Sequence, residues 1–342
     1  MSKRALVISG GGAKGAFAVG AIKALAANAP ATTFDIYVGT STGSLIVPFA
    51  AAGALDLLEK MYTTVTTADV IQKGNVGERI LADNSLFNAD PLARLITQNF
   101  NDDFCNKLLA SPKEVYLATT CLQTGDSVYF STKDAPAGSN ANVIKAGNPD
   151  TFRRAVMASA CQPVFMPPIE VEKGKRPMRQ YVDGGVRAYA GIQLAVDAGA
   201  DEIYAILLSP SAGTPDNEVF NDAFTILEHT IDIFTTEVAV TNLRLPMLYT
   251  QGLRYIADVK AGMLKKGKTQ AEIDEFFDID RTNPFSGKTP VTIYVVRPDS
   301  PLGGGPGGLN FIPDEMKGML AKGVNSMSDL LAHLPPNGSN MV

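Results

Sequence analysis

The chain has 342 residues, of which 45% are apolar and 19% charged, a balance that excludes a disordered protein and predicts a globular one. Its 30 basic and 35 acidic residues give a formal net charge of −5, and the absence of a Lys/Arg cluster argues further against a nucleic-acid partner. Three cysteines without C-x-x-C spacing and two histidines predict neither a disulfide framework nor a metal site. We expect buried, reduced thiols at Cys105, Cys121 and Cys161.

The N-terminus begins with Lys3, Arg4 and an apolar run, residues 5–8, that resembles the start of a secretion signal. Three glycines and Lys14 interrupt this run, so we expect a buried first strand over residues 5–9. No later stretch offers roughly 20 uninterrupted apolar residues, so no membrane-spanning helix is expected. Without a cleavable signal or a span, a cytoplasmic or non-classically exported protein is expected, and transient membrane association is compatible with both.

Strand–glycine–helix units occupy the first 55 residues. After the strand at 5–9 we expect a helix over 15–27, a strand over 36–39 and a helix over 44–52 with a kink at Pro48. Two such units in succession predict an α/β layered fold.

The rest of the chain continues this alternation. Expected strands are 115–120, 127–131, 203–209 and 291–296, and expected helices are 91–98, 151–158 and 193–198. Segments rich in Gly, Pro, Ser or Asn predict loops at 133–150, 210–220 and 298–310.

An amphipathic helix is indicated by apolar residues at spacings of three and four. These are Phe224, Leu227, Ile231, Phe234 and Val238. Core packing is the favoured interpretation of this stripe, and a lipid-facing cap or lid is the alternative.

The first glycine-rich loop has two competing interpretations. Gly10-x-Gly12-x-x-Gly15 matches the dinucleotide fingerprint formally, and Asp35 follows at the distance expected of a ribose-binding acid. However, Asp35 precedes the second strand instead of ending it, and Lys14 is followed by Gly15 and not by the Ser or Thr of a phosphate-binding P-loop. The alternative is an oxyanion hole of backbone N–H groups, in which losing one donor costs ~3–4 kcal/mol.

The second glycine motif has the G-x-S-x-G form of a nucleophile elbow, with Gly39, Ser41 and Gly43 between an apolar strand and a helix. A Ser–His–Asp triad would need His229 or His333 as its base. His229 lies inside the amphipathic helix and His333 lies ten residues from the C-terminus, so both are interpreted as surface or packing residues.

A carboxylate is the better candidate for the base. Asp183 follows a short apolar run and precedes Gly184 and Gly185, which places it at a strand end with open space around it. A carboxylate can accept the serine proton if it is close, oriented and partly desolvated, since desolvation raises its basicity.

The three motifs together closely resemble the patatin-like phospholipase family, whose lipid acyl hydrolases use a Ser–Asp dyad. Residues 85–92 and 158–168 also resemble the family in order and spacing. The resemblance covers residues 4–210 well and 211–332 more loosely. It implies a three-layer α/β/α sandwich around a mostly parallel sheet. It also implies a single domain over 4–332, whose second part holds cap helices, the last strand and a C-terminal helix.

The resemblance also implies roles for individual residues. Ser41 is expected to be the nucleophile and Asp183 the general base, and the oxyanion hole is expected to comprise the amides of Gly10, Gly11, Gly12 and Thr42. The residues expected to support these motifs are Lys14, Gly15, Gly39, Gly43, Gly184 and Gly185. Lys14 stands where many members have Arg, and Tyr189, Ala190 and Gly191 replace a family stretch of the Asn-Asn-Pro type, which puts the local loop structure in question.

Three functions follow from these residues. The leading one is hydrolysis of phospholipids or other acyl lipids through an acyl-Ser41 intermediate, with no metal or cofactor and with peripheral contact to a membrane or micelle. The second is transfer of the acyl group from the same acyl-enzyme to an alcohol or thiol acceptor. A Ser–His pair in place of the Ser–Asp pair would favour this function. The third is a nucleotide-binding module without catalysis.

Overall fold

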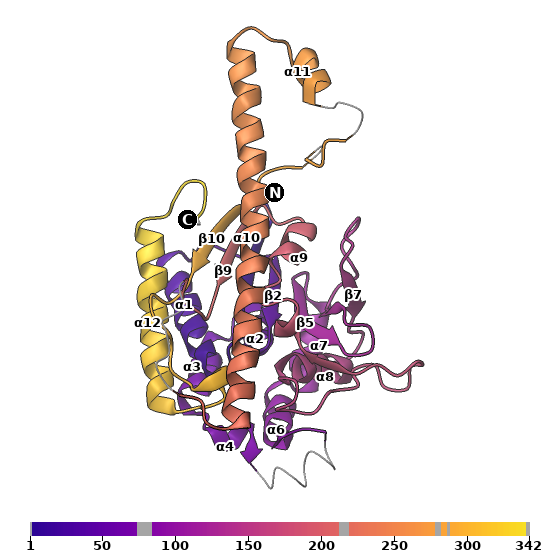
Figure 1. Ribbon diagram of the computed structural model, residues 1–342, viewed down its shortest axis with the longest axis vertical. Helices are drawn as coiled ribbons and strands as arrows, with labels where there is room; N and C mark the ends of the chain where they lie inside the picture. Colours follow the sequence, from indigo (N-terminus) through magenta and orange to yellow (C-terminus); the bar gives the residue numbers. More distant parts are fainter. Residues whose placement is uncertain (1, 74–83, 212–218, 278–281, 286–287, 340–342) are drawn as a thin grey trace.

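The computed structural model describes residues 2–73, 84–211, 219–277, 282–285 and 288–339. Its centre is an eight-stranded sheet in the order β10-β9-β1-β2-β5-β6-β7, with β8 paired to β5 (Figure 1). The strands are β1 Arg4–Ile8, β2 Ile36–Thr40, β5 Glu114–Cys121, β6 Ser127–Ser131, β7 Asn142–Lys145, β8 Tyr181–Asp183, β9 Glu202–Ile206 and β10 Thr292–Val296. The pairs from β10 to β5 are parallel, whereas β5 pairs antiparallel with β6 and β8. The expectation of a mostly parallel sheet is confirmed.

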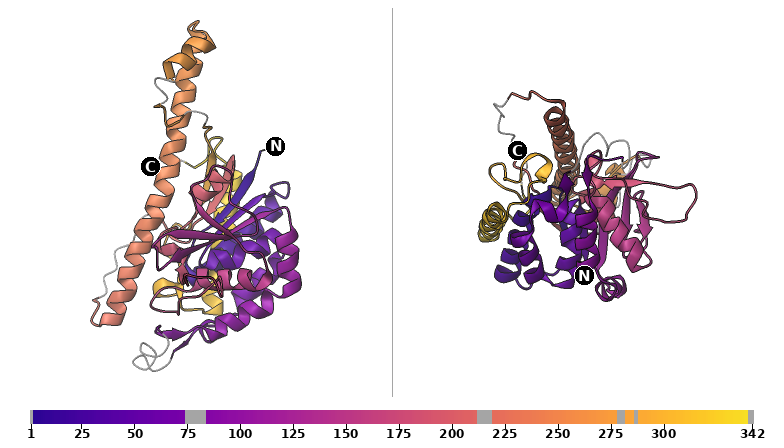
Figure 2. Two further views of the ribbon diagram at one scale, coloured as in Figure 1. Left: turned by 90° about the vertical axis from the view of Figure 1, so that its right-hand side faces the viewer. Right: turned by 90° about the horizontal axis from the view of Figure 1, so that it is seen from below.

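Helices cover both faces of this sheet, because side chains that alternate along each strand are apolar on both sides. In β1, Leu6 and Ile8 pack toward one face, and Ala5 and Val7 toward the other. The first face carries α1 Gly15–Asn28, α2 Thr42–Ala52, α3 Leu55–Thr64, α8 Pro149–Ala160 and α12 Pro313–Ala332. The second face carries α9 Ile192–Asp197 and part of α10 Ala223–Lys265 (Figure 2). The result is the expected helix–sheet–helix layering.

Smaller elements complete the fold. They are α4 Thr67–Val70, α6 Asp90–Asn99, α7 Asp102–Ala110, α11 Gln270–Phe277, a two-stranded pair of β3 Gln72–Lys73 and β4 Phe87–Asn88, and the 3₁₀ turns η1 Gly12–Lys14, η2 Gly184–Val186 and η4 Pro306–Gly308. All three cysteines are buried and free, as expected.

Two sequence-based predictions need correction. The predicted loop at 133–150 is wrong, because it contains the edge strand β7 and the start of α8. β7 pairs only with β6 and its four residues are not fully buried, so it lacks the continuous apolar run that marks a central strand. The predicted strand over 203–209 ends earlier, at Ile206. The loop predicted at 210–220 lies partly outside the described residues.

The predicted amphipathic helix is also longer than expected, with 43 residues. Its middle packs Ala239, Leu243 and Met247 on the second face of the sheet. Its later half projects beyond the body together with α11 (Figure 1). The core-packing interpretation of the apolar stripe is wrong at Phe234, which is 65% exposed, and the side chain of Phe224 lies outside the described residues.

Candidate active site

Ser41 occupies a sharp turn between β2 and α2. Its backbone is strained for a residue with a side chain, with φ 55° and ψ −124°. The flanking glycines permit this turn, because a Cβ at Gly39 would lie 2.4 Å from the carbonyl oxygen of Gly43, and one at Gly43 would lie 2.3 Å from that of Ile8. The chain therefore makes the sharp strand-to-helix turn that is typical of a nucleophile elbow.

Ser159 of α8 holds the backbone of the elbow through hydrogen bonds. The Ser41 amide donates to Ser159 Oγ at 3.0 Å, and Ser159 Oγ donates to the carbonyl of Ala118 at 2.6 Å. The hydroxyl of Ser44 lies 2.7 Å from that of Ser159. This network is buried and ties α2, α8 and β5 together at the position of Ser41.

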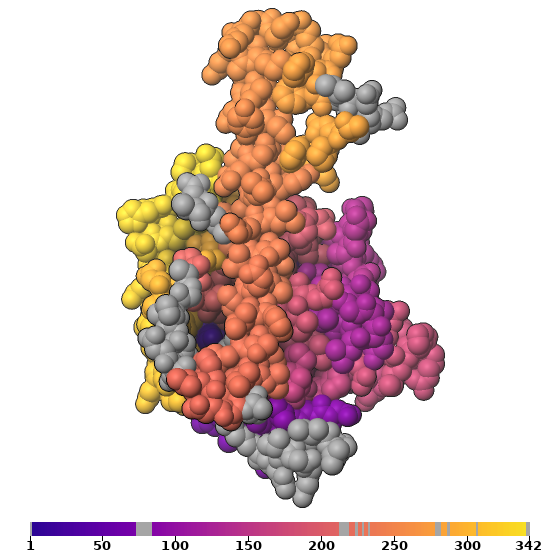
Figure 3. All heavy atoms as spheres, viewed as in Figure 1, coloured from indigo at the N-terminus to yellow at the C-terminus, as the bar shows by residue number. Residues whose placement is uncertain are grey.

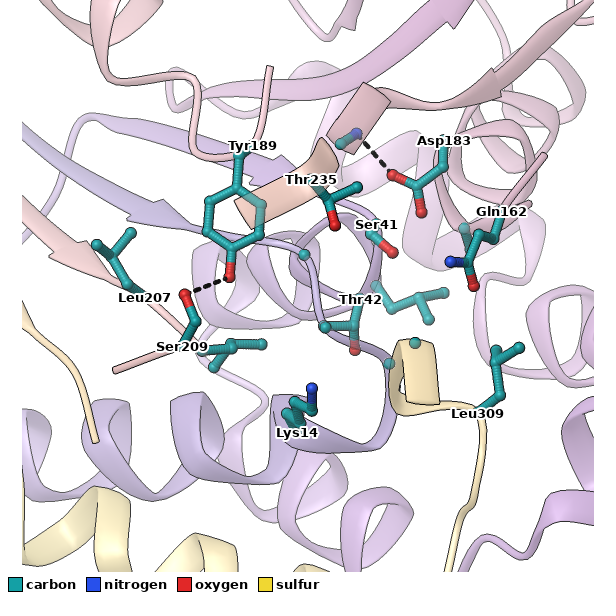
Figure 4. A pocket seen from close by; sticks show the side chains of 18 of the residues that line it. Lys14, Ser41, Thr42, Gln162, Asp183, Tyr189, Leu207, Ser209, Thr235 and Leu309 are labelled. Atoms are coloured by element: carbon teal, nitrogen blue, oxygen red, sulfur yellow. Dashed lines mark hydrogen bonds between the residues drawn. The ribbon is translucent and has the colours of Figure 1, made fainter. Parts of the chain in front are cut away.

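Asp183 ends β8, and its carboxyl lies beside the Ser41 side chain (Figure 4). The Gly185 amide donates to Asp183 Oδ1 at 2.7 Å, and the Asp183 amide donates to the carbonyl of Cys161 at 2.9 Å. Only 7% of Asp183 is exposed, and this burial raises the pKa of its carboxyl to about 6, although the nearby Ser41 hydroxyl and the hydrogen bond from the Gly185 amide oppose the rise. Asp183 is therefore held next to Ser41 with a basicity suited to accepting a proton.

Gly184 and Gly185 leave the space that this arrangement needs. A Cβ at Gly184 would lie 2.5 Å from the carbonyl oxygen of Ala118, and one at Gly185 would lie 3.1 Å from Asp183 Oδ1. A side chain at Gly184 would push the end of β8 away from β5, and one at Gly185 would crowd the Asp183 carboxylate, so both glycines support the position of Asp183.

The first glycine loop lies against the elbow at the carboxyl end of β1. Gly11 and Gly12 have φ of 152° and 55°, which favour glycine. The Gly10 amide donates to the carbonyl of Tyr189 at 3.4 Å, whereas the described residues provide no acceptor for the amides of Gly11 and Gly12. Thr42 is the first residue of α2, so its amide has no partner within the helix. Within the described residues, the amides of Gly11, Gly12 and Thr42 thus have no backbone acceptor, which is compatible with the predicted oxyanion hole.

Lys14 and Gly15 connect this loop to α1. A Cβ at Gly15 would lie 2.5 Å from Thr42 Oγ1, which is itself hydrogen-bonded to the hydroxyl of Tyr62. The Lys14 side chain lines the cavity below Ser41 and Thr42 (Figure 4). Gly15 therefore allows the close approach of the loop to Thr42, and Lys14 places a positive charge at the cavity wall.

Ser41, Thr42, Asp183 and the loop of Gly10, Gly11 and Gly12 line one cavity of about 1010 Å³. Figure 4 shows Ser41 between Asp183 on one side and the pair of Tyr189 and Ser209 on the other. Most of the remaining wall is apolar, with side chains from several helices. Examples are Leu45, Phe49, Met61, Leu92, Ile96, Phe100, Leu243, Leu309, Phe311 and Met316. Figure 3 shows the hollow beside α10, with indigo atoms of the N-terminal part at its floor.

The histidines and Asp35 lie in different surroundings. His333 is exposed near Asp329 of α12 and does not line the cavity. His229 packs on the ring of Phe220 with centroids 3.9 Å apart and also lines the cavity. The Asp35 carboxylate accepts a hydrogen bond of 3.1 Å from the amide of Arg4, at the opposite end of β1 from the glycine loop. An acid at that end cannot bind the ribose of a nucleotide held by the loop.

Several residues around the site escaped the sequence analysis. Ser159 lies in a stretch that resembles the family, but its role depends on a contact between α2 and α8. Gly308 belongs to a segment predicted only as a loop, yet a Cβ there would lie 2.1 Å from the carbonyl oxygen of Gly11. Arg297, which also lines the cavity, follows the last strand without any local signal.

Among the described residues, no helix is long and apolar enough to cross a membrane. No group of three or more His, Cys, Asp or Glu side chains in this part of the chain is placed to hold a metal ion.

Comparison with known proteins gives one family. The model of the patatin-like phospholipase family matches residues 6–196. The search of curated proteins gave no significant match. Among solved structures, the chain is similar to VipD from Legionella pneumophila, with 11% identity, a TM-score of 0.44, and coverage of 97% of this chain and 67% of that one. Because the family match spans more than half of the chain and includes the glycine loop, the elbow and Asp183, the protein belongs to the patatin-like phospholipases, a family of lipid acyl hydrolases.

Proposed function

We propose that the protein hydrolyses fatty acyl esters of phospholipids or related lipids through an acyl-Ser41 intermediate, as a phospholipase A or lysophospholipase. The observation that carries this proposal is the position of Ser41 beside the buried Asp183 on the wall of a largely apolar cavity. Peripheral contact with a membrane or micelle belongs to the same proposal, because such substrates reside there.

In the acylation step, Ser41 Oγ attacks the ester carbonyl while Asp183 accepts the hydroxyl proton. The carbonyl oxygen becomes an anion, and the amides of Gly11, Gly12 and Thr42 donate to it. Gly10 can join them only by giving up its long hydrogen bond to Tyr189. Asp183 then returns the proton to the leaving alcohol. In deacylation Asp183 takes a proton from the water that attacks the acyl carbonyl, and it passes this proton to Ser41 Oγ as the acyl–Oγ bond breaks and the fatty acid leaves.

The apolar walls account for the acyl part of the substrate. Burying each CH₂ group contributes about 0.8 kcal/mol, so a fatty chain along these walls supplies binding free energy far from the reacting carbonyl. The walls come from elements between β1 and α12, which supports a single catalytic domain over residues 4–332.

The proposal is tested by following free fatty acid release from a lysophospholipid in detergent micelles. The wild-type protein is expected to release fatty acid, and Ser41→Ala is expected to release none above background. Asp183→Asn is expected to lower kcat/KM by a factor of roughly 10²–10⁴, because a general base typically contributes that much to the rate. Release at the wild-type rate by Ser41→Ala would refute the acyl-Ser41 scheme.

Acyl transfer is a second candidate because His229 lines the cavity and could serve as a base for a Ser–His pair. In that case His229→Gln would abolish turnover, whereas Asp183→Asn would retain it. Added alcohol acceptors would also yield acylated acceptor in place of free fatty acid.

A further inference from the structure

The cavity wall is cationic although the whole chain is acidic. Among the described lining residues, the Lys, Arg, Asp and Glu side chains are three cations and one anion. They are Lys14, Arg244, Arg297 and the catalytic Asp183. The formal net charge of the chain is −5, so the positive wall is a local feature. A cleft with one sign of charge and apolar walls concentrates ligands of the opposite sign.

Arg297 is the most unusual of these cations. It is half-buried directly after β10, and within the described part of the chain no carboxylate forms an ion pair with it. Its Nε atom is buried and finds no hydrogen-bond acceptor among the described residues. Burial lowers the pKa of Arg297, as expected where water is removed from a cation without a compensating anion. A buried charge or donor without a partner is costly, so an anion supplied by a ligand would relieve an unfavourable arrangement.

Polar groups beside Arg297 extend toward the nucleophile. Burial raises the pKa of the Tyr189 phenol, and the positive charge of Arg297 opposes this rise. The Tyr189 hydroxyl lies 3.1 Å from Ser209 Oγ. Tyr189 and Ser209 both line the cavity, on the side of Ser41 opposite Asp183 (Figure 4). The polar part of the cavity therefore continues from Ser41 toward Arg297, whereas the side chains that α2 and α6 contribute to the wall are mainly apolar.

The sheet sets the distance between Arg297 and the elbow. Val296 pairs with Ile206, Ile206 with Ile8, and Ile8 with Gly39. Arg297, directly after β10, therefore lies at the same level as Thr40, the last residue of β2, and three strand spacings separate the two by roughly 14 Å. The side chains of Arg297 and Ser41 both reach into the cavity and shorten this gap, which leaves room for a glycerol unit between an ester carbonyl and a phosphate.

We propose that Arg297 is a specificity-determining residue that binds the phosphate of an acyl phospholipid while Ser41 attacks the ester. The planar guanidinium can donate two parallel hydrogen bonds to phosphate oxygens, which a neutral glyceride cannot accept in the same way. Lys14 and Arg244 strengthen the positive field around it. This inference rests on the proposed hydrolase function and adds selectivity for phosphate-bearing acyl esters over neutral ones.

A matched pair of substrates tests this selectivity. They are a 1-acyl glycerol and a 1-acyl glycerol 3-phosphate with the same chain, assayed below their aggregation concentrations. Arg297→Gln is expected to lower the ratio of kcat/KM for the phosphate ester to that for the neutral ester by roughly ten- to a hundredfold, mainly through KM, as expected for losing a hydrogen bond to a charged group. Arg297→Lys keeps the positive charge but loses the paired N–H donors of the guanidinium, so it is expected to retain part of the preference for the phosphate ester.

Arg94→Gln is the control, because it removes the same charge from an exposed site on α6 that does not line the cavity. Its ratio is expected to equal that of the wild type. An unchanged ratio in Arg297→Gln, or an equal loss for both esters, would overturn the proposal.

Calorimetric binding to the Ser41→Ala variant separates this inference from the proposed function. Adding Arg297→Gln to Ser41→Ala is expected to weaken binding of the acyl glycerol phosphate more than tenfold, and binding of free fatty acid by less than threefold, since the guanidinium is proposed to hold the phosphate. Equal weakening for the fatty acid would assign Arg297 to the product carboxylate and overturn the proposal. If the wild type hydrolyses neither ester, the proposed function fails, yet this comparison still decides the role of Arg297.

Discussion

At the scale of single residues, the site depends on the contrast between Ser41 and Asp183. The nucleophile sits on a strained turn at the cavity floor, whereas its partner is buried and has a carboxyl pKa of about 6. The residue types and the order of the motifs were enough to predict this pair. Ser159, Tyr189 and Arg297 were not predictable, because each contributes through a contact with a residue remote in the sequence.

Activity is expected to depend on pH through Asp183. The general base must be ionised, so kcat/KM for a water-soluble ester should rise as the pH passes through about 6 and then level off. A pH series from 4.5 to 9 with a buffer of constant ionic strength measures this. A rise centred well above 7, abolished in His229→Gln, would contradict the role of Asp183 and favour a histidine base.

The same pKa shift predicts that Asp183→Asn stabilises the protein at neutral pH. The folded-state pKa lies above the unfolded value of 3.8, so ionising Asp183 above pH 6 costs free energy of folding, up to about 3 kcal/mol. Asn removes this cost while its side-chain oxygen still accepts from Gly185. Thermal unfolding at pH 7.5 should show a higher midpoint for Asp183→Asn, and the advantage should shrink as the pH falls from 6 toward 4. A lower midpoint at pH 7.5 would show that the carboxylate is well solvated.

At the scale of elements, strand–turn–helix units place the catalytic groups at one edge of the sheet. The alternation of short apolar runs and glycines was enough to predict β1, α1, β2 and α2. The edge strand β7 and the full length of α10 were not predictable. β7 has too little buried surface to produce a pattern, and the projecting half of α10 faces no core that would select an apolar stripe.

The packing of α1 on α12 gives a prediction for stability. The two helices approach so closely that a Cβ at Gly323 would lie 1.9 Å from the carbonyl oxygen of Phe17, and one at Gly20 would lie 2.0 Å from that of Leu320. Gly323→Ala is expected to lower the free energy of unfolding by roughly 1–3 kcal/mol through overpacking. Urea unfolding measures the change.

Gly318→Ala is the matched control on the same helix. Nothing lies within 4 Å of a Cβ at Gly318, so alanine there should raise stability by up to about 1 kcal/mol through its helix propensity. Equal effects of the two substitutions would show that α1 and α12 are not in backbone contact.

At the scale of the whole molecule, the cavity and the projecting end of α10 are separate. Within the described chain, no residue between Arg244 and Val295 lines the cavity. Arg254 donates to the carbonyl of Val291 at 3.2 Å, so the start and end of the projection lie next to each other. The projection can therefore be removed without opening the sheet or the cavity.

Replacement of residues 256–289 by a short Gly-Ser linker is expected to leave kcat/KM for a water-soluble ester within about twofold of the wild type, since excisions that spare buried contacts are tolerated. Circular dichroism of the shortened protein provides the control for folding. A loss of more than tenfold in a folded protein would mean that the projection holds α10 over the cavity.

The most direct test of the acyl-Ser41 mechanism is labelling with a fluorophosphonate probe, followed by peptide mass spectrometry. The account predicts that the wild-type protein is labelled on Ser41 alone, that Asp183→Asn is labelled much more slowly at the same residue, and that Ser41→Ala is not labelled. Equal labelling of Ser41→Ala and the wild type, or labelling of another residue, would contradict it.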